Sequence, residues 1–164
     1  MIEVASDVSR SDSQYIESLE RTKKLTNRIM NPLIQDYIIK KGKDAKYYAN
    51  VIDSALLRQF PPLMKLTKGD FREKIILDLG CGSNESVSRL GVIYEPWLCR
   101  ALLELGAYPV GIDREDNSGE KFKSYQVDLN KPDSLSFLKR GSFDIANMRG
   151  LLTSRGFNGN FKRN

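Results

Sequence analysis

The order of apolar and polar positions divides the chain into a helical first part and a later part built from short strands. In the first part, apolar residues recur at spacings of three and four, which is typical of amphipathic helices. Asp44 is a suitable N-cap for the last of these helices, and we expect Pro61 and Pro62 to end it. The pattern predicts a helical lead-in over residues 11–70, which either covers the sheet or roofs a substrate pocket, and a flexible terminus at residues 1–10.

From residue 74 onward, short apolar runs alternate with helical stretches. The expected strands cover residues 74–78, 108–113, 124–127 and 143–147. One helix is expected over residues 96–105, and a second, shorter helix is expected to begin at Pro132 and to end at Gly141. Strands separated by helices pair in parallel through right-handed crossovers. The sequence therefore predicts an α/β domain over residues 71–150, followed by a tail at residues 151–164.

Length and composition are those of a soluble globular protein with one substantial core. The chain has 164 residues, of which 40% are hydrophobic and 29% charged. Its longest apolar runs are too short to cross a membrane, and the amino terminus lacks the basic and apolar regions of a signal peptide. These features predict a cytoplasmic protein.

Charge and residue usage exclude several classes of site. The net charge of +5 comes largely from lysines and arginines scattered over the first part, which is typical of a solvated helical face rather than of a nucleic-acid-binding surface. The chain contains no histidine and only two cysteines, Cys81 and Cys99. Zinc sites, Ser-His-Asp triads and Cys-His dyads are therefore excluded, and we expect no metal site.

Three acidic residues stand at the ends of consecutive expected strands: Asp78, Asp113 and Asp128. Gly80 and Gly82 directly follow the first strand, where they allow a sharp turn that can leave backbone N–H groups bare. The carboxyl ends of parallel strands share one crevice, so the acids should converge on one ligand. The second acid could accept hydrogen bonds from a ribose diol, and the third from an exocyclic amine.

Two ligand classes use this layout. A dinucleotide-binding fingerprint would require a glycine at position 85, but that residue is Glu85, whose charge is poorly placed beside a pyrophosphate. S-adenosylmethionine carries no phosphate, and its sulfonium and amino groups are cationic, which acidic residues favour. The residues therefore favour the methyl donor over a nicotinamide dinucleotide.

The segments Asp78–Ser83, Gly111–Asp113 and Val127–Leu129 resemble, in order, the first three motifs of class I S-adenosylmethionine-dependent methyltransferases. The resemblance implies a Rossmann-like parallel sheet of about four strands in the order 3-2-1-4. It also implies a set of cofactor-binding roles, with the methionine end held by Asp78, Gly80, Cys81 and Gly82, the ribose by Asp113, and the adenine by Asp128 and Leu129. Each acid could instead cap the turn that follows it, and both cysteines could be packing residues.

The chain departs from the family pattern in three places. Asn84 replaces the usual third glycine, residues 85–94 form an insertion, and the chain stops soon after its fourth strand. The fourth strand would then be an unpaired edge, so either a second copy or partner chain completes the sheet, or the chain is a truncated product. Asn147 and Arg149 stand where substrates often bind in this family, although a structural role fits both residues better.

The function expected from these features is methyl transfer from S-adenosylmethionine to an unidentified acceptor. The residues nominate no general base, and the sequence after the fourth strand lacks the N-P-P-Y pattern of amino-methylating enzymes. The alternative is a non-catalytic half-domain that binds S-adenosylmethionine or a partner through its open edge. A nicotinamide-dependent oxidoreductase is a further rival, against which Glu85 argues.

Overall fold

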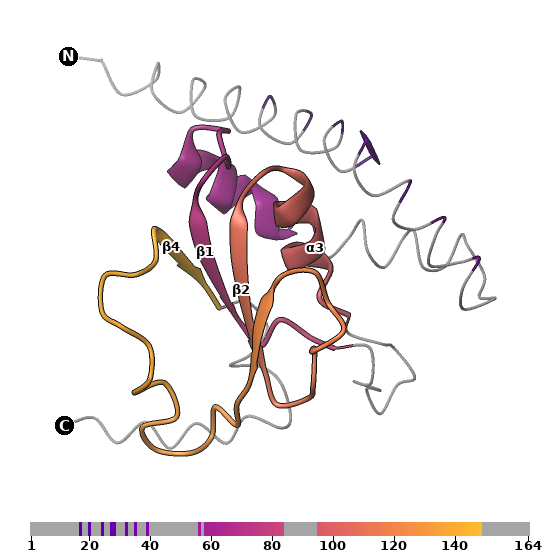
Figure 1. The fold of residues 1–164 in the computed structure, drawn as a ribbon. Coiled ribbons are helices and arrows are strands. Elements are labelled where there is room, and N and C mark those ends of the chain that lie inside the picture. Colours follow the sequence, from indigo (N-terminus) through magenta and orange to yellow (C-terminus); the bar gives the residue numbers. More distant parts are fainter. Residues whose placement is uncertain are drawn as a thin grey trace, which may run out of the picture. The chain divides into compact units, whose positions relative to one another are not determined.

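The computed structural model describes residues 56, 58–83 and 95–148, together with isolated helical positions between residues 17 and 39 (Figure 1). The chain divides into two compact units, Met1–Asp70 and Phe71–Asn164. Within the described residues, no helix is long and apolar enough to cross a membrane. The predictions that rest on residues 1–10, 40–55 (which include the N-cap Asp44), 84–94 and 149–164 lie outside the described part of the chain.

In the first unit, the helix over residues 58–67 runs straight through the two prolines that were expected to end it. That prediction is wrong. A proline within a helix removes one backbone hydrogen bond, but the apolar spacing continues beyond it. Phe60 and Leu63 are almost fully buried, and the Thr67 hydroxyl donates to the Leu63 carbonyl at 3.0 Å. Burial of this face offsets the donors missing at the two prolines, and the helix ends only before Gly69, which has a φ of 80°.

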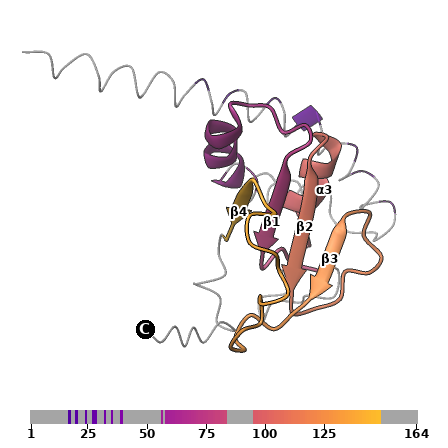
Figure 2. The ribbon, with the colours of Figure 1, turned by 60° about the vertical axis from the view of Figure 1, so that its left-hand side comes forward.

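The second unit is built around a four-stranded parallel sheet, whose strands lie side by side in Figure 2. The strands are β1 (Ile75–Leu79), β2 (Tyr108–Asp113), β3 (Lys123–Gln126) and β4 (Ile145–Asn147). Their order is β3-β2-β1-β4, and all three pairings are parallel. The predicted α/β Rossmann-like fold and its strand order 3-2-1-4 are therefore confirmed, with β3 and β4 at the edges of this described sheet.

The helix α3 (Trp97–Glu104) covers one face of the sheet and buries its apolar residues there (Figure 1). It begins after Pro96 and is followed by Gly106, which has a φ of 80°. On this face, Gly111 of β2 lets the strand approach its neighbours closely. A Cβ at this position would lie 2.8 Å from the Cys81 sulfur and 2.8 Å from the Phe122 ring.

The opposite face carries a second apolar cluster, centred on Leu77 of β1 and on Val110 and Ile112 of β2. The connection from β3 to β4 runs over this face (Figure 2). Its partly buried Leu138 and Phe143 pack against the cluster. The clusters on the two faces follow from the alternation of side chains along each strand.

The connection between β3 and β4 does not contain the short helix expected between Pro132 and Gly141. Residues 132–137 form successive turns, held by bonds such as that from the Ser136 N–H to the Asp133 carbonyl at 2.9 Å. Asp133 adopts a φ of 56°, a left-handed conformation that interrupts a helix in its first turn. The predicted bounds of the strands are otherwise close, with β1 and β3 each shifted by one residue and β4 shorter than expected.

Candidate functional site

The turn after β1 bends sharply because two of its glycines have left-handed backbones. Gly80 has a φ of 73° and Gly82 a φ of 87°, which side chains rarely allow. The sequence indicated that this turn can leave N–H groups bare, but those of Gly80, Cys81 and Gly82 all have partners. The first two donate to the Ile112 carbonyl of β2 at 2.8 and 3.1 Å. The turn is therefore fastened to the neighbouring strand and does not offer these three donors to a phosphate group.

Asp113 at the end of β2 holds the third of these N–H groups. Its Oδ2 accepts a hydrogen bond of 2.8 Å from the Gly82 N–H, and its Oδ1 accepts one of 3.2 Å from the Glu115 N–H. The side chain is half-buried. Each carboxylate oxygen can accept more than one hydrogen bond, so Asp113 retains capacity for further donors.

Asp78 at the end of β1 is almost fully buried and lies between β4 and α3. Its Oδ1 accepts a 2.7 Å hydrogen bond from the Asn147 side-chain amide, and its Oδ2 lies 3.8 Å from the Cys99 thiol, which donates to it. Burial raises the pKa of the Asp78 carboxyl to about 7, against the lowering effect of the Asn147 and Cys99 hydrogen bonds. The structure thus joins Asp78 to Asn147, a residue placed near substrate by family analogy.

Asn117 was not singled out in the sequence, yet it connects the loop after β2 to the glycine turn. Its side-chain amide donates to the Gly82 carbonyl at 2.8 Å, and its main-chain carbonyl accepts from the Ser124 hydroxyl at 3.1 Å. Its Oδ1 is the buried side-chain atom, within the described residues, that has no hydrogen-bond partner. Orphaned buried acceptors are uncommon in native proteins and call for a partner such as a ligand donor. An asparagine in a polar loop carries no sequence signal for this role.

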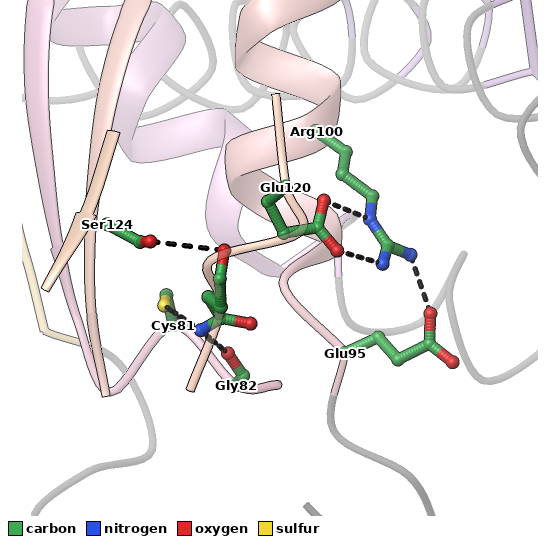
Figure 3. Close-up of polar contacts among 7 residues, drawn as sticks. Cys81, Gly82, Glu95, Arg100, Glu120 and Ser124 are labelled. Atoms are coloured by element: carbon green, nitrogen blue, oxygen red, sulfur yellow. Dashed lines mark hydrogen bonds and ion pairs between the residues drawn. The ribbon is translucent and has the colours of Figure 1, made fainter. Parts of the chain in front are cut away.

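A second group missed by the sequence reasoning surrounds Arg100 of α3 (Figure 3). The guanidinium donates to Glu95 at 2.6 Å and to both carboxylate oxygens of Glu120, with the Nε–Oε2 distance at 3.0 Å. The side chain of Glu95 is only 2% exposed. These contacts join the start of α3 to the loop that leads into β3, and they hold the loop that contains Asn117.

The third predicted acid has a local structural role. The Asp128 carboxylate accepts a hydrogen bond of 3.0 Å from the Asn130 N–H, which caps the turn after β3. The Val127 N–H donates to the Asp113 carbonyl at 2.7 Å, so the ends of β2 and β3 are adjacent. Leu129 packs against the apolar cluster on the face opposite α3. Arg149 lies outside the described residues.

Cys81, predicted to contact the cofactor, is buried between the sheet and α3. It belongs to an apolar cluster with Cys99 and Phe122. The amide of Asn117 lies 3.7 Å from its sulfur. The short side chain at this position fits the narrow space opposite Gly111.

Comparisons of the chain with protein-family models, with curated protein sequences and with solved structures give no match. The class of protein is therefore defined by the fold, a parallel α/β sheet of Rossmann-like order with a glycine turn at its carboxyl edge.

Proposed function

We propose that this protein binds S-adenosylmethionine at the carboxyl edge of the sheet and transfers its methyl group to an acceptor. In this proposal the glycine turn and Asp78 border the methionine end, Asp113 accepts from the ribose hydroxyls, and Asp128 and Leu129 border the adenine. The resemblance of the three sequence motifs to class I methyltransferases supports these roles.

The observation that carries the proposal is the contact between Asp113 and Gly82. It brings the acid that ends β2 against the turn that ends β1, which is the juxtaposition that a nucleoside ligand needs at adjacent strand ends. The occupied N–H groups of Gly80 and Cys81 argue in the same direction. A loop whose N–H groups already donate to the Ile112 carbonyl is poorly suited to bind a pyrophosphate. This arrangement disfavours a nicotinamide dinucleotide as the ligand.

The charges and the orphaned acceptor of the site also suit this ligand. Asp113 provides a carboxyl group close to the turn, and a sulfonium or ammonium group is stabilised by nearby negative charge. The Oδ1 of Asn117, which has no hydrogen-bond partner within the described residues, would be satisfied by an N–H donor. No histidine is needed, because methyl transfer depends mainly on holding donor and acceptor close and aligned.

Bound S-adenosylmethionine would supply an electrophilic methyl group. The contribution of the chain is to bind and orient it. Asp113 keeps the turn in place through the Gly82 N–H, and Asn117 does so through the Gly82 carbonyl. Asn147, at the end of β4, borders the same edge through its bond to Asp78.

Calorimetric titration with S-adenosylmethionine tests the binding site. We expect heat of binding in the wild type and its loss in Asp113→Ala, because the variant lacks the proposed ribose acceptor. Asp116→Ala is the matched control, since it removes an exposed carboxylate from the same loop whose partner is Ser118. Absence of heat at millimolar ligand in the wild type would refute the cofactor assignment. Unchanged affinity in Asp113→Ala would refute the ribose assignment alone.

Transfer itself is tested with a methyl-labelled donor and a cell extract as the source of acceptor. Incorporation of label that requires Asp113 supports an enzyme. Binding without incorporation would favour the non-catalytic cofactor-binding module. Binding of a nicotinamide dinucleotide in place of S-adenosylmethionine would favour the oxidoreductase instead.

A further inference from the structure

A groove of about 580 Å³ lies in the second unit, away from the residues of the candidate site. Its lining includes Val110 and Tyr108 of β2, Tyr125 of β3, and Phe137 and Leu138 of the connection to β4. None of the acids assigned to the cofactor borders it. The volume is in the range of pockets that accept ligand groups.

The β3–β4 connection borders the groove with Phe137, Leu138 and Lys139. Leu138 and Phe143 pack against the sheet, but several apolar side chains near the amino ends of the strands stay accessible. Tyr108 is 58% exposed, Phe137 48% and Ile75 38%. Exposed apolar groups gathered around one depression, rather than scattered singly, are typical of an interaction surface.

The charges at the groove have one sign. Lys121 and Lys123 flank it at the start of β3, and Lys139 flanks it on the β3–β4 connection. None of the residues described as lining the groove is acidic. The neighbouring Asp144 carboxylate is bonded to the Ile75 N–H at 2.8 Å. An apolar floor with three ammonium groups at its border is complementary to a partner that combines apolar side chains with several carboxylates.

We propose that this groove is a docking site for an acidic amphipathic helix of a partner protein. The apolar face of such a helix would fill the groove over Val110 and Leu138, and its acidic residues would meet the three lysines. This is the common mode in which a helix binds a hydrophobic groove through anchors on one face. The inference does not depend on the proposed cofactor.

The arrangement of the rings favours a peptide over a single-stranded nucleic acid. Bases bind by stacking on open aromatic faces. Here the Tyr125 and Phe137 rings pack against each other with centroids 4.9 Å apart and planes tilted by 60°. The Lys123 ammonium lies 5.2 Å from the centroid of the Tyr125 ring. The lining also includes the aliphatic residues Ile75, Val110 and Leu138, which suit leucine-like side chains better than bases.

Fluorescence anisotropy with a labelled synthetic peptide tests the proposal on the full chain. The probe is an amphipathic helix of leucine and glutamate, about five turns long, and the control peptide carries lysine in place of glutamate. We expect only the glutamate peptide to bind, and its affinity to fall about tenfold or more in the triple variant Lys121→Glu, Lys123→Glu, Lys139→Glu. The matched variant Lys65→Glu, Lys68→Glu, Lys131→Glu makes the same change of charge at exposed positions outside the groove and should bind within about twofold of the wild type.

Two further measurements decide the outcome. Phe137→Ser removes a half-exposed ring, keeps the lysines, and should weaken the glutamate peptide severalfold, which separates a groove from a purely ionic attraction. A deoxythymidine oligonucleotide that binds through the same lysines while the peptide fails would assign the surface to nucleic acid and overturn the proposal. Failure of the glutamate peptide to bind, or equal loss in the triple variant and its matched control, would overturn it as well.

Discussion

Replacing Asp78 with asparagine should change the pH dependence of the stability of the second unit. The carboxyl is buried, with the Asn147 amide and the Cys99 thiol as its partners. Asparagine keeps the shape and can still accept the hydrogen bond from Asn147, but it does not ionise. The variant therefore removes the cost of a buried charge with little change in packing.

The expected magnitude follows from the pKa of Asp78. Burial raises it from 3.8 to about 7 in the folded protein. The folded state thus holds the Asp78 proton more tightly than the unfolded state does. Protonation of Asp78 therefore stabilises the folded state, and this stabilisation is fully present below about pH 4. This effect is lost as the pH rises to about 7. A difference of roughly three pH units, at about 1.4 kcal/mol each, gives an upper limit of about 4 kcal/mol, of which about 3 kcal/mol falls above pH 5.

Urea unfolding followed by tryptophan fluorescence measures this effect directly. Trp97 is the only tryptophan of the chain and is buried on α3, so its emission reports on the second unit. The free energy of unfolding of Asp78→Asn, relative to the wild type, should increase by about 3 kcal/mol from pH 5 to pH 8. Asp116→Asn is the matched control and should show no such change between pH 5 and pH 8, because the Ser118 hydroxyl lowers the pKa of Asp116 and its titration therefore affects stability only at more acid pH. A pH-independent difference between Asp78→Asn and the wild type would show that the buried carboxyl does not titrate in this window.

Two further substitutions test the packing and the charges around the site. Gly111→Ala should lower the free energy of unfolding by about 1–3 kcal/mol, because its Cβ would meet the Cys81 sulfur and the Phe122 ring at 2.8 Å. Gly119→Ala, with nothing within 4 Å of its Cβ, should change that free energy by less than about 0.5 kcal/mol, and equal effects in the two variants would contradict the close packing. Arg100→Met should lower the free energy of unfolding by about 3 kcal/mol, because it leaves the buried Glu95 unpaired. Adding Glu95→Gln should recover part of this loss, and unfolding followed by circular dichroism measures both effects. No recovery in the double variant would show that the pair is not coupled.

The strand ends could be read from the sequence because the signal there is local. The apolar run before Asp78, the glycines after it and the acid at Asp113 follow one another within short segments. The alternation of strands and helices then fixes parallel pairing and leaves few topologies. The order of the sheet was predicted from the family resemblance, and the structure confirms it.

Two local rules failed where the surrounding structure decided the outcome. Pro61 and Pro62 do not stop the helix over residues 58–67, because the buried face that includes Phe60 and Leu63 continues past them. Pro132 does not begin a helix, because Asp133 is left-handed. Propensity at a single residue amounts to a few kcal/mol at most, which burial or turn geometry can exceed.

By itself, the sequence determined which residue types stand at the carboxyl edge of the sheet. Only the tertiary structure decided how their polar atoms are used. The N–H groups of Gly80 and Cys81 donate to a carbonyl of the neighbouring strand, and Asp78 accepts a hydrogen bond from Asn147 of β4. The bridge from Asn117 to the glycine turn is of the same kind. Such contacts join residues far apart in the chain, and their geometry depends on strand register and burial, which no local pattern encodes.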